Sequence, residues 1–455
     1  MISGNNLLRP RYALNQSLTS HLRPLPTQCA VLVTGEPRPP DPQNVPILNQ
    51  IQQETRTPDG AAGPLSVCLV GPGWRFTSGI SYYTCRLANS MAGERCETSV
   101  VLLRCLLPRL FYPGRRRVGL KRASMAYRPD VAVFDGIDWW WGRSLLGAVR
   151  FLRARRARVL LLQWWTAAAL HTYLLLAVAA RIAGMRVVVE MHELQDPGEA
   201  DLPVARHYGR LGLRALLRLA HGCIVHSRAD RQLLESSFGP VDIPVALAPH
   251  GPYDQFRDVA EPADPAVAAA VAAVRTAPKQ DDVVNLLYFG VIRSYKGLED
   301  LLRVFNALPR DEAERFWLTV VGETWQGCTE PARLIAASPH ADRITFVNEY
   351  VPDEVVGAAF GHADVAVLPY RRSSSSGNLH VAMSWGLPVV VTNVGGLPEA
   401  ASGYAGAVFV PPRDPAMLRE GLLKAATLVG QKFPDPRSWH DTLAAVVIAA
   451  GLGVR

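Results

Sequence analysis

Two cations closely follow an apolar run in the C-terminal half of this 455-residue chain. Residues 285–289 are predicted to form a strand that ends at Gly290, and Arg293 and Lys296 follow just before a helix predicted from about Leu298. A glycine lets the backbone approach a ligand, a guanidinium offers a planar fork of donors, and a lysine near a helix N-terminus adds a compact charge. The group suits a bound diphosphate, such as that of a nucleotide-sugar. The alternative is an ordinary strand-turn-helix connection with two solvated cations.

A second group of donors is predicted further along the chain. Ser376, Gly377 and Asn378 end a serine run and precede a helix expected from about Leu379. Backbone amides at a helix N-terminus bind anions, so these residues can add to the stabilisation of a departing diphosphate without a metal. A flexible linker is the alternative, although a linker is unexpected between an apolar strand and an apolar helix.

The elements that must position these residues follow an alternating pattern. From Ser66 onward, short β-branched runs alternate with helical patterns, which predicts an α/β fold with parallel sheets. We expect two doubly wound Rossmann-like domains facing a cleft, with ligands bound beyond the carboxyl ends of the strands. The expected strands are 67–70, 98–103, 131–134, 159–162, 187–190, 223–226 and 245–248 in the first domain, and 285–289, 317–321, 344–346, 365–368, 389–392 and 407–410 in the second.

Further motifs fall in the loops after these strands. They are Gly-Pro-Gly-Trp-Arg-Phe-Thr-Ser-Gly at 71–79, Glu-Met-His-Glu at 190–193, Pro-His-Gly at 249–251 and Gly-Leu-Pro-Val-Val-Val-Thr-Asn-Val-Gly-Gly-Leu-Pro-Glu at 386–399. With these motifs in this order, the chain resembles the family 4 glycosyltransferases of the GT-B fold over roughly residues 65–440. The resemblance implies a retaining, metal-independent transfer of a hexose from a nucleotide-sugar, with no cofactor.

The resemblance also implies roles for single residues. Gly79 matches a glycine that admits the phosphates or sugar of the donor, and His192 matches a histidine placed against the donor sugar and its developing positive charge. A structural role is the alternative for a lone histidine. The loop after His192 is acidic, and its carboxylates are candidates for binding the acceptor. These acceptor-side candidates are Glu193, Asp196 and Glu199.

One departure from the family pattern concerns the donor site. Many members carry two glutamates, seven residues apart, before the Gly-x-Pro-Val turn, and Ser373 and Val381 stand at those positions here. The roles of those glutamates cannot be carried over to a serine and a valine. Glu399 is near the same expected site and is a candidate substitute, with a structural role such as capping as the alternative.

Domain boundaries follow from composition and from the resemblance. Residues 1–63 are rich in Pro, Asn, Gln and Thr, and we expect a disordered extension there. Residues 64–260 are expected to form an N-terminal, acceptor-side domain, 261–283 a linker, and 284–430 a C-terminal nucleotide-sugar-binding domain. Residues 431–455 are expected to form a C-terminal helix that can cross back to the N-terminal domain.

The positive charge is concentrated in one stretch of the chain, which bears on what the protein contacts in the cell. Residues 104–158 hold 13 arginines and Lys121 against three aspartates, a net +11, whereas the whole chain carries only +8. Apolar residues alternate with cations between Leu106 and Arg117, which suits an anionic membrane surface; a solvated basic loop is the alternative. Nucleic acid is not expected, because no recognition motif accompanies the charge.

The seven cysteines show no Cys-x-x-Cys spacing, which favours a reducing cytosol and no zinc.

No secretory signal is expected, since no charged start with an apolar core opens the chain. The uncharged segment Trp164–Ala180 is short for a bilayer span and fits a buried helix better. We therefore expect a cytoplasmic protein that can associate peripherally with the inner face of the cell membrane.

The sequence leaves three functions open. The first is a glycosyltransferase that moves a hexose from a nucleotide-sugar to a lipid-linked, polysaccharide or glycoconjugate acceptor. The second is a nucleotide-sugar-binding partner protein with impaired catalysis, because both family glutamates are absent. The third is a sugar-nucleotide 2-epimerase on the same fold.

Overall fold

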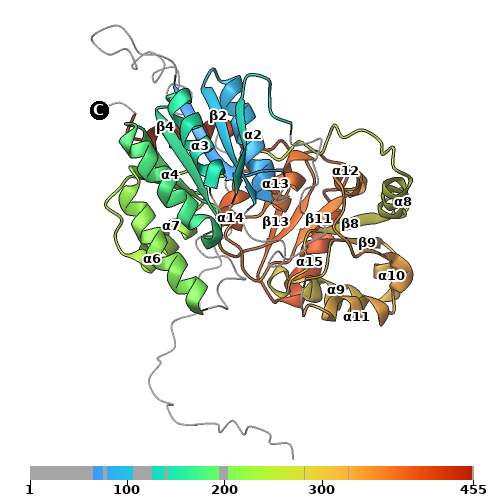
Figure 1. The fold of residues 1–455 in the computed structure, drawn as a ribbon. Helices are drawn as coiled ribbons and strands as arrows, with labels where there is room; N and C mark the ends of the chain where they lie inside the picture. Colours follow the sequence, from blue (N-terminus) through green and yellow to red (C-terminus); the bar gives the residue numbers. More distant parts are fainter. Residues whose placement is uncertain are drawn as a thin grey trace, which may run out of the picture. The chain divides into compact units, whose positions relative to one another are not determined.

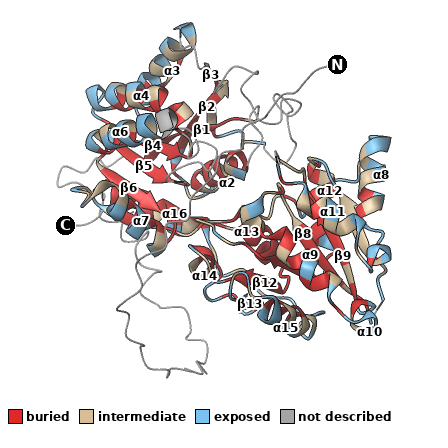
Figure 2. Ribbon diagram, turned by 90° about the horizontal axis from the view of Figure 1, so that it is seen from below, coloured by how far each residue is buried: buried red, intermediate tan, exposed pale blue. Residues whose placement is uncertain are grey.

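The structure is a computed structural model that describes residues 65–74, 79–105, 126–138, 142–193, 203–280, 282–325 and 327–452. Two parallel sheets organise these residues, one of seven strands and one of six (Figure 1). The expected α/β fold with two doubly wound domains is confirmed, and each of the thirteen predicted strands is present. Buried residues line both sheets, and exposed residues lie on the outer faces of the helices (Figure 2).

The N-terminal sheet has the strand order β3-β2-β1-β4-β5-β6-β7. Its strands are β1 (Ser66–Pro72), β2 (Glu97–Cys105), β3 (Ala132–Asp138), β4 (Val159–Trp164), β5 (Arg186–Met191), β6 (Gly222–Val225) and β7 (Val245–Leu247). All neighbouring pairs are parallel. Parallel strands are buried on both faces, which explains their nearly continuous apolar sequences. In β1, for example, Val67 and Leu69 belong to one core cluster, and Cys68 and Val70 belong to another.

Helices cover both faces of this sheet. They are α2 (Gly79–Gly93), α3 (Gly142–Arg155), α4 (Leu170–Ile182), α6 (Pro203–Leu219) and α7 (Arg228–Phe238), with a 3-10 turn, η4, at Ala167–Ala169. The C-terminal helix α16 (Trp439–Ala449) packs against α2, β6 and β7, so the end of the chain contributes to the N-terminal domain.

The C-terminal sheet has the strand order β10-β9-β8-β11-β12-β13. Its strands are β8 (Val284–Phe289), β9 (Phe316–Val321), β10 (Ile344–Val347), β11 (Val365–Leu368), β12 (Val389–Thr392) and β13 (Ala407–Val410). Its helices are α8 (Pro265–Val274), α9 (Leu298–Asn306), α10 (Arg310–Ala313), α11 (Glu330–Ala336), α12 (Asp353–His362), α13 (Gly377–Ser384), α14 (Leu397–Ala400) and α15 (Pro415–Ala426), with 3-10 turns η5 (Ser294–Lys296) and η6 (Ala341–Arg343). The α8 helix lies within the expected linker and packs against α12.

The uncharged segment 164–180 contains the end of β4, η4 and most of α4. One face of α4 is buried, and it includes Leu170, Tyr173, Leu176 and Ala177. Among the described residues, no helix combines the length and the apolar character needed to span a membrane.

The described cysteines are all free thiols. Cys68, Cys85 and Cys223 are buried, and burial raises the pKa of each thiol to about 12. These three thiols therefore stay protonated and pack as small apolar side chains.

Candidate functional site

The loop after β8 brings a glycine, a lysine and an asparagine into contact. Gly290 has φ +111, a conformation that residues with side chains rarely adopt. A Cβ at this position would lie 2.6 Å from Nδ2 of Asn378 and 3.1 Å from Nζ of Lys296. The glycine therefore keeps free the space between the ammonium and the start of α13.

Two aromatic rings hold the cations of this loop. The guanidinium carbon of Arg293 lies 4.0 Å from the ring centroid of Trp325, and Nζ of Lys296 lies 5.5 Å from that of Tyr370. Such cation–π contacts orient the two cations. Burial lowers the pKa of Lys296, and the nearby charge of Arg293 acts in the same direction. A bound anion would oppose both effects, so this loop is suited to a phosphate.

The start of α13 faces the same loop. Ser376 stands at the N-cap, but its side chain forms no cap hydrogen bond, which leaves the amides of the first turn for another acceptor. The side chain of Asn378 donates to the carbonyl of Phe289 at 2.6 Å and to the hydroxyl of Tyr370 at 3.1 Å. The structure thus joins the two groups of donors that the sequence placed about 85 residues apart.

An ion pair fixes the geometry of the two loops. Arg371 donates to both carboxylate oxygens of Asp300, at 2.7 and 2.8 Å, and to the carbonyl of Ser294 at 2.9 Å. A two-pronged contact of this kind is directional as well as attractive. It ties the segment after β11 to the start of α9, so that Lys296 and Tyr370 keep their relative positions.

A glycine replacement tests how closely these loops approach. Gly297 has φ +68, and a Cβ there would lie 1.9 Å from the carbonyl oxygen of Pro369. Gly327 has φ +78 but has no atom within 4 Å of its ideal Cβ. Both alanine variants carry the left-handed strain of about 1–2 kcal/mol. We expect Gly297→Ala to lower the free energy of unfolding by about 1–3 kcal/mol more than Gly327→Ala, because of the added overlap.

Urea unfolding of the two variants measures this difference. Equal losses of stability would mean that the loops have room to separate, and that they do not hold Lys296 in a fixed place.

His192 follows β5, as the sequence predicts, but its ring lies inside the N-terminal domain. It is 3% exposed. Its Nε2 lies 3.5 Å from Oε2 of Glu190, and its Nδ1 lies 3.2 Å from Nε2 of His226. Both ring nitrogens therefore face protein groups.

A buried network surrounds Glu190, which is fully inaccessible to solvent. The hydroxyl of Tyr83 donates to its Oε1 at 2.5 Å, and the amide of Gln163 donates to its Oε2 at 3.1 Å. Burial alone would raise the pKa of this carboxyl, but contact with His192, together with the Tyr83 hydrogen bond, holds the pKa below its usual value. The network therefore favours an ionised Glu190 beside His192.

His192 belongs to a cluster of six residues, and it is the one sequence-based candidate among them. The other five are Tyr83, Gln163, Glu190, His226 and His250. A signal was present in the sequence. The three histidines each follow one of three successive strands, and the carboxyl ends of neighbouring parallel strands meet at one edge of a sheet.

Gly79 is the first residue of α2 and is exposed. No atom lies within 4 Å of its ideal Cβ, so packing does not require a glycine at this position. The open space is consistent with the expected approach of a ligand.

The acidic loop after β5 is described only at its start. Glu193 is half-buried and directly follows His192. Asp196 and Glu199 lie outside the described residues.

Glu399 contacts the backbone at the start of α7. Both of its carboxylate oxygens accept from the amide of Arg228, at 2.9 and 3.0 Å. At the positions of the two absent glutamates, Val381 is buried in an apolar core, and the hydroxyl of Ser373 donates to the carbonyl of Ser375 at 2.8 Å. Glu399 therefore has a capping contact, which is one of the two roles expected for it.

Asp230, which is near the contact between Glu399 and Arg228, gives a prediction for how stability depends on pH. Burial raises the pKa of Asp230 to about 6, and the charge of Glu399 acts in the same direction. A carboxyl whose pKa is higher in the folded state than its usual 3.8 makes folding progressively less favourable as the pH rises from about 4 to about 6, and the full penalty is present above about 6. We expect Asp230→Asn to raise the free energy of unfolding by about 1 kcal/mol at pH 8. The substitution removes the cost of ionising a buried carboxyl, and part of this gain is offset because one added amide N–H must be solvated.

The gain should disappear as the pH falls to 4, where Asp230 is protonated in the folded protein. Urea unfolding of both proteins at pH 4, 6 and 8 measures the difference. A gain that is the same at all three values would rule out the titration as its cause.

Comparisons with known proteins bear on the family and on the fold. Residues 284–427 match the family model of the group 1 glycosyl transferases. A GDP-mannose:glycolipid 4-beta-D-mannosyltransferase of Xanthomonas campestris pv. campestris is 33% identical over 147 residues, which are 32% of this chain and 38% of that protein. The chain thus matches little more than a third of the length of this curated relative.

Two solved structures share the fold over a larger part of the chain. Sucrose-phosphate synthase from Thermosynechococcus elongatus superposes with a TM-score of 0.54 at 16% identity, covering 85% of this chain and 94% of that one. Anabaena HepE in complex with UDP-glucose gives a TM-score of 0.52 at 14% identity, with coverages of 85% and 93%. At these identities the likeness concerns the fold alone.

The family match covers β8 to α15, which includes Gly290, Arg293, Lys296 and the start of α13. With its two doubly wound domains the chain has the GT-B fold, and its residues 284–427 are similar to the group 1 glycosyl transferases.

Proposed function

We propose that this protein transfers a hexose from a nucleotide-sugar to a lipid-linked or glycan acceptor, with retention of configuration. One observation carries the proposal. Arg293 and Lys296 lie beside Gly290 and the uncapped start of α13, in the domain that matches the group 1 glycosyl transferases.

The chemistry of these groups supports a diphosphate leaving group. Arg293 is held over Trp325 and Lys296 over Tyr370, so both cations are positioned before a ligand arrives. Preorganised donors stabilise charge that develops on a leaving oxygen, and they do so without a metal ion. In this proposal no Mg²⁺ or Mn²⁺ bridges the diphosphate. Gly79 belongs to the N-terminal side of the transfer site, Glu193, Asp196 and Glu199 belong to the acceptor side, and the buried His192 stands behind the site at the end of β5.

Thermal unfolding with UDP-, GDP-, ADP- and dTDP-sugars, without added divalent metal, tests donor binding. A ligand that binds only the folded state raises Tm in proportion to the logarithm of its excess over Kd. We expect a selective shift with one nucleotide class, followed by slow release of the free sugar. If none of the four classes raises Tm, the proposed donor site is wrong.

A second function has one observation in its favour. The two glutamate positions hold Ser373 and the buried Val381, so no carboxylate is available there. A protein that binds the donor but neither hydrolyses nor transfers it would be a nucleotide-sugar-binding partner. Conversion of the donor to an epimer, without an acceptor, would instead indicate a sugar-nucleotide 2-epimerase.

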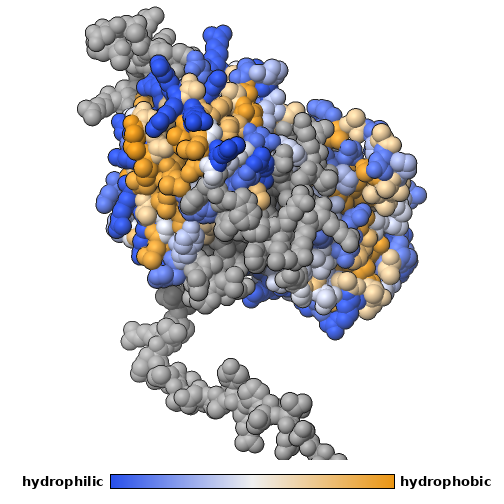
Figure 3. All heavy atoms as spheres, in the orientation of Figure 1, coloured by the Kyte–Doolittle hydropathy of each residue, from blue (hydrophilic) through white to orange (hydrophobic). Residues whose placement is uncertain are grey.

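We also propose peripheral contact with an anionic membrane, through a face made by α3, α4 and α6. Leu175, Val178 and Ile182 form one exposed stripe on α4, and Tyr208 and Leu211 are exposed on the neighbouring α6. Hydrophobic side chains gather over these helices in Figure 3. Exposed arginines surround the stripe, namely Arg150, Arg153 and Arg155 on α3, Arg181 on α4, and Arg210, Arg214 and Arg218 on α6.

This face differs from the one expected from sequence. Residues 106–125, with Leu106, Leu107, Leu110, Phe111, Tyr112 and five of the thirteen arginines of the basic stretch, lie outside the described residues. The arginines of α3 belong to the basic stretch 104–158, but the apolar contribution of α4 and α6 does not. Arginine near anionic headgroups contributes about 1 kcal/mol per residue, and inserted apolar side chains add to it.

Co-sedimentation with vesicles that contain phosphatidylserine, at low salt, tests this contact. We expect Ile182→Glu to reduce binding, whereas Ile448→Glu, a half-exposed isoleucine on α16, should have little effect. If neither variant differs from the parent protein, or the parent does not sediment, the membrane proposal fails.

A further inference from the structure

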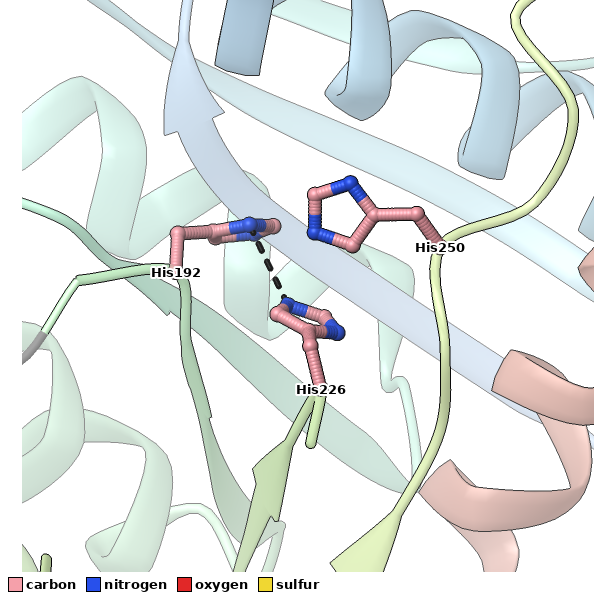
Figure 4. A group of neighbouring side chains, drawn as sticks. All are labelled: His192, His226 and His250. Atoms are coloured by element: carbon pink, nitrogen blue, oxygen red, sulfur yellow. Dashed lines mark hydrogen bonds between the residues drawn. The ribbon is translucent and has the colours of Figure 1, made fainter. Parts of the chain in front are cut away.

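Three histidines meet inside the N-terminal domain, at the carboxyl edge of its sheet. His192 follows β5, His226 follows β6, and His250 lies three residues after β7. These strands are neighbours in the sheet, which brings residues far apart in the sequence to one point. Figure 4 shows the three rings converging. Each offers one nitrogen, and the three nitrogens lie within 4.8 Å of one another.

One ring nitrogen that faces outward from this point has a hydrogen-bond partner, since Nδ1 of His226 contacts the carbonyl of Ala248 at 2.8 Å. Nε2 of His192 lies 3.5 Å from the carboxylate of Glu190 without a hydrogen bond to it, close enough for the carboxylate to orient the ring. A histidine that donates one N–H to a carbonyl or carboxylate presents a lone pair at its other nitrogen. This outer arrangement is typical of metal-ligating histidines.

The inner nitrogens of these two rings, Nδ1 of His192 and Nε2 of His226, lie 3.2 Å apart. When each ring carries its proton on the outer nitrogen, both inner nitrogens present lone pairs to a shared cation. Two ligands of a tetrahedral Zn²⁺ at about 2.05 Å are separated by about 3.3 Å. The observed spacing therefore fits a shared metal ion.

His250 supplies an independent indication. It is 6% exposed, and neither of its ring nitrogens has a hydrogen-bond partner. A buried imidazole without partners is costly, and such a group calls for an explanation such as an unseen ion. One of its nitrogens lies within 4.8 Å of the ligand nitrogens of the other two histidines.

We propose that His192, His226 and His250 bind one transition-metal ion of the Zn²⁺ class, with a water in the fourth position and Glu190 orienting His192. Imidazole is a preferred ligand for zinc, and three histidines with one open position form a known type of zinc site. The ion links the ends of β5, β6 and the loop after β7. It is separate from the diphosphate loop, so it does not replace Arg293 or Lys296.

The test uses the full-length protein without a histidine tag, stripped with a chelator and then given one equivalent of Zn²⁺ or Co²⁺. We expect one metal per chain after gel filtration, a rise in Tm, and a zinc X-ray absorption spectrum with nitrogen neighbours at about 2.0–2.1 Å. His226→Gln and His250→Gln should lose the bound metal, and Glu190→Gln should bind it about 10- to 100-fold more weakly.

His340→Gln is the matched control. His340 is also buried, but it lies in the C-terminal domain, where its Nε2 contacts the carbonyl of Leu308 at 3.0 Å. This variant should retain one metal per chain. The proposal is overturned if the parent protein retains no metal, because a proton then bridges His192 and His226. It is also overturned if the His226 and His250 variants retain as much metal as the His340 control.

If the histidine variants do not fold, the spectrum of the parent protein decides. Three nitrogen neighbours support the site, and a shell of oxygen neighbours contradicts it. Donor-induced Tm shifts are measured in the same samples, so failure of the metal site and failure of the donor site are distinguished.

Discussion

Replacing Lys296 or Arg293 by alanine is expected to weaken nucleotide-sugar binding about 10- to 150-fold in each case. The loss of one charge-assisted contact to a phosphate costs about 1.5–3 kcal/mol, and 1.4 kcal/mol is a factor of ten in Kd. The effect should appear mainly in donor affinity, because both cations are held in place by aromatic rings in the protein itself. Calorimetric titration with the nucleoside diphosphate measures it.

The structure provides a matched control for Arg293. Arg343 also lies over a tryptophan, with its guanidinium carbon 6.0 Å from the ring centroid of Trp317, but it stands before β10 at the opposite end of the sheet. Arg343→Ala should leave donor affinity unchanged. If it weakens binding as much as Arg293→Ala, the loss reflects general charge and not a phosphate contact.

Arg293→Lys separates charge from shape. A lysine keeps the positive charge but loses the planar fork and the stacking on Trp325. We expect a loss between those of the parent protein and Arg293→Ala. Full affinity in the lysine variant would show that the charge alone is needed.

Much of the fold could be predicted because parallel strands are buried on both faces. Their apolar runs and the turns between them are visible in the sequence, as at residues 67–70 and 285–289, and the observed strands differ from the predicted ones mainly at their ends. The proximity of the residues in the loop after β8 could be predicted for a related reason. Gly290, Arg293 and Lys296 are close in the sequence, so the order of residues already places them in one turn.

The remainder of the site depends on contacts between distant segments. The rings beneath the cations, Trp325 and Tyr370, lie 32 and 74 positions beyond Arg293 and Lys296, respectively, and no local pattern links them. The burial of His192 also could not be predicted, because it depends on the nearby carboxyl of Glu190 and on His226, which arrives from the next strand. A rule that compares the residues after neighbouring strands would have found the three histidines.

These contacts separate two kinds of chemistry in the molecule. The cations near Gly290 are suited to an anionic leaving group, and the histidines near Glu190 offer nitrogen ligands to the proposed metal ion. A substitution among the cations should therefore leave the metal content unchanged, and a substitution among the histidines should leave the donor affinity unchanged. Measuring donor affinity and metal content in the same variants tests this independence.

Replacing Trp439 by alanine is expected to lower the free energy of unfolding by about 3–5 kcal/mol, the usual cost of removing a large buried aromatic ring. Trp439 is the first residue of α16 and is 6% exposed. Its ring packs directly on Gly251, where a Cβ would lie 2.3 Å from Cδ2 of the tryptophan, and its centroid lies 4.9 Å from that of Tyr83. The loss should therefore reach the histidine cluster as well as α16.

Trp439→Phe is the control that separates packing from hydrogen bonding. The indole N–H donates to the carbonyl of Pro252 at 3.2 Å, and phenylalanine keeps most of the ring contact while losing this bond. We expect it to cost about 1 kcal/mol, well below the alanine variant. Urea unfolding measures both changes. A loss of less than 1 kcal/mol in Trp439→Ala would show that α16 does not belong to the core of the N-terminal domain, because a helix that completes that core cannot lose its largest buried side chain without a large loss of stability.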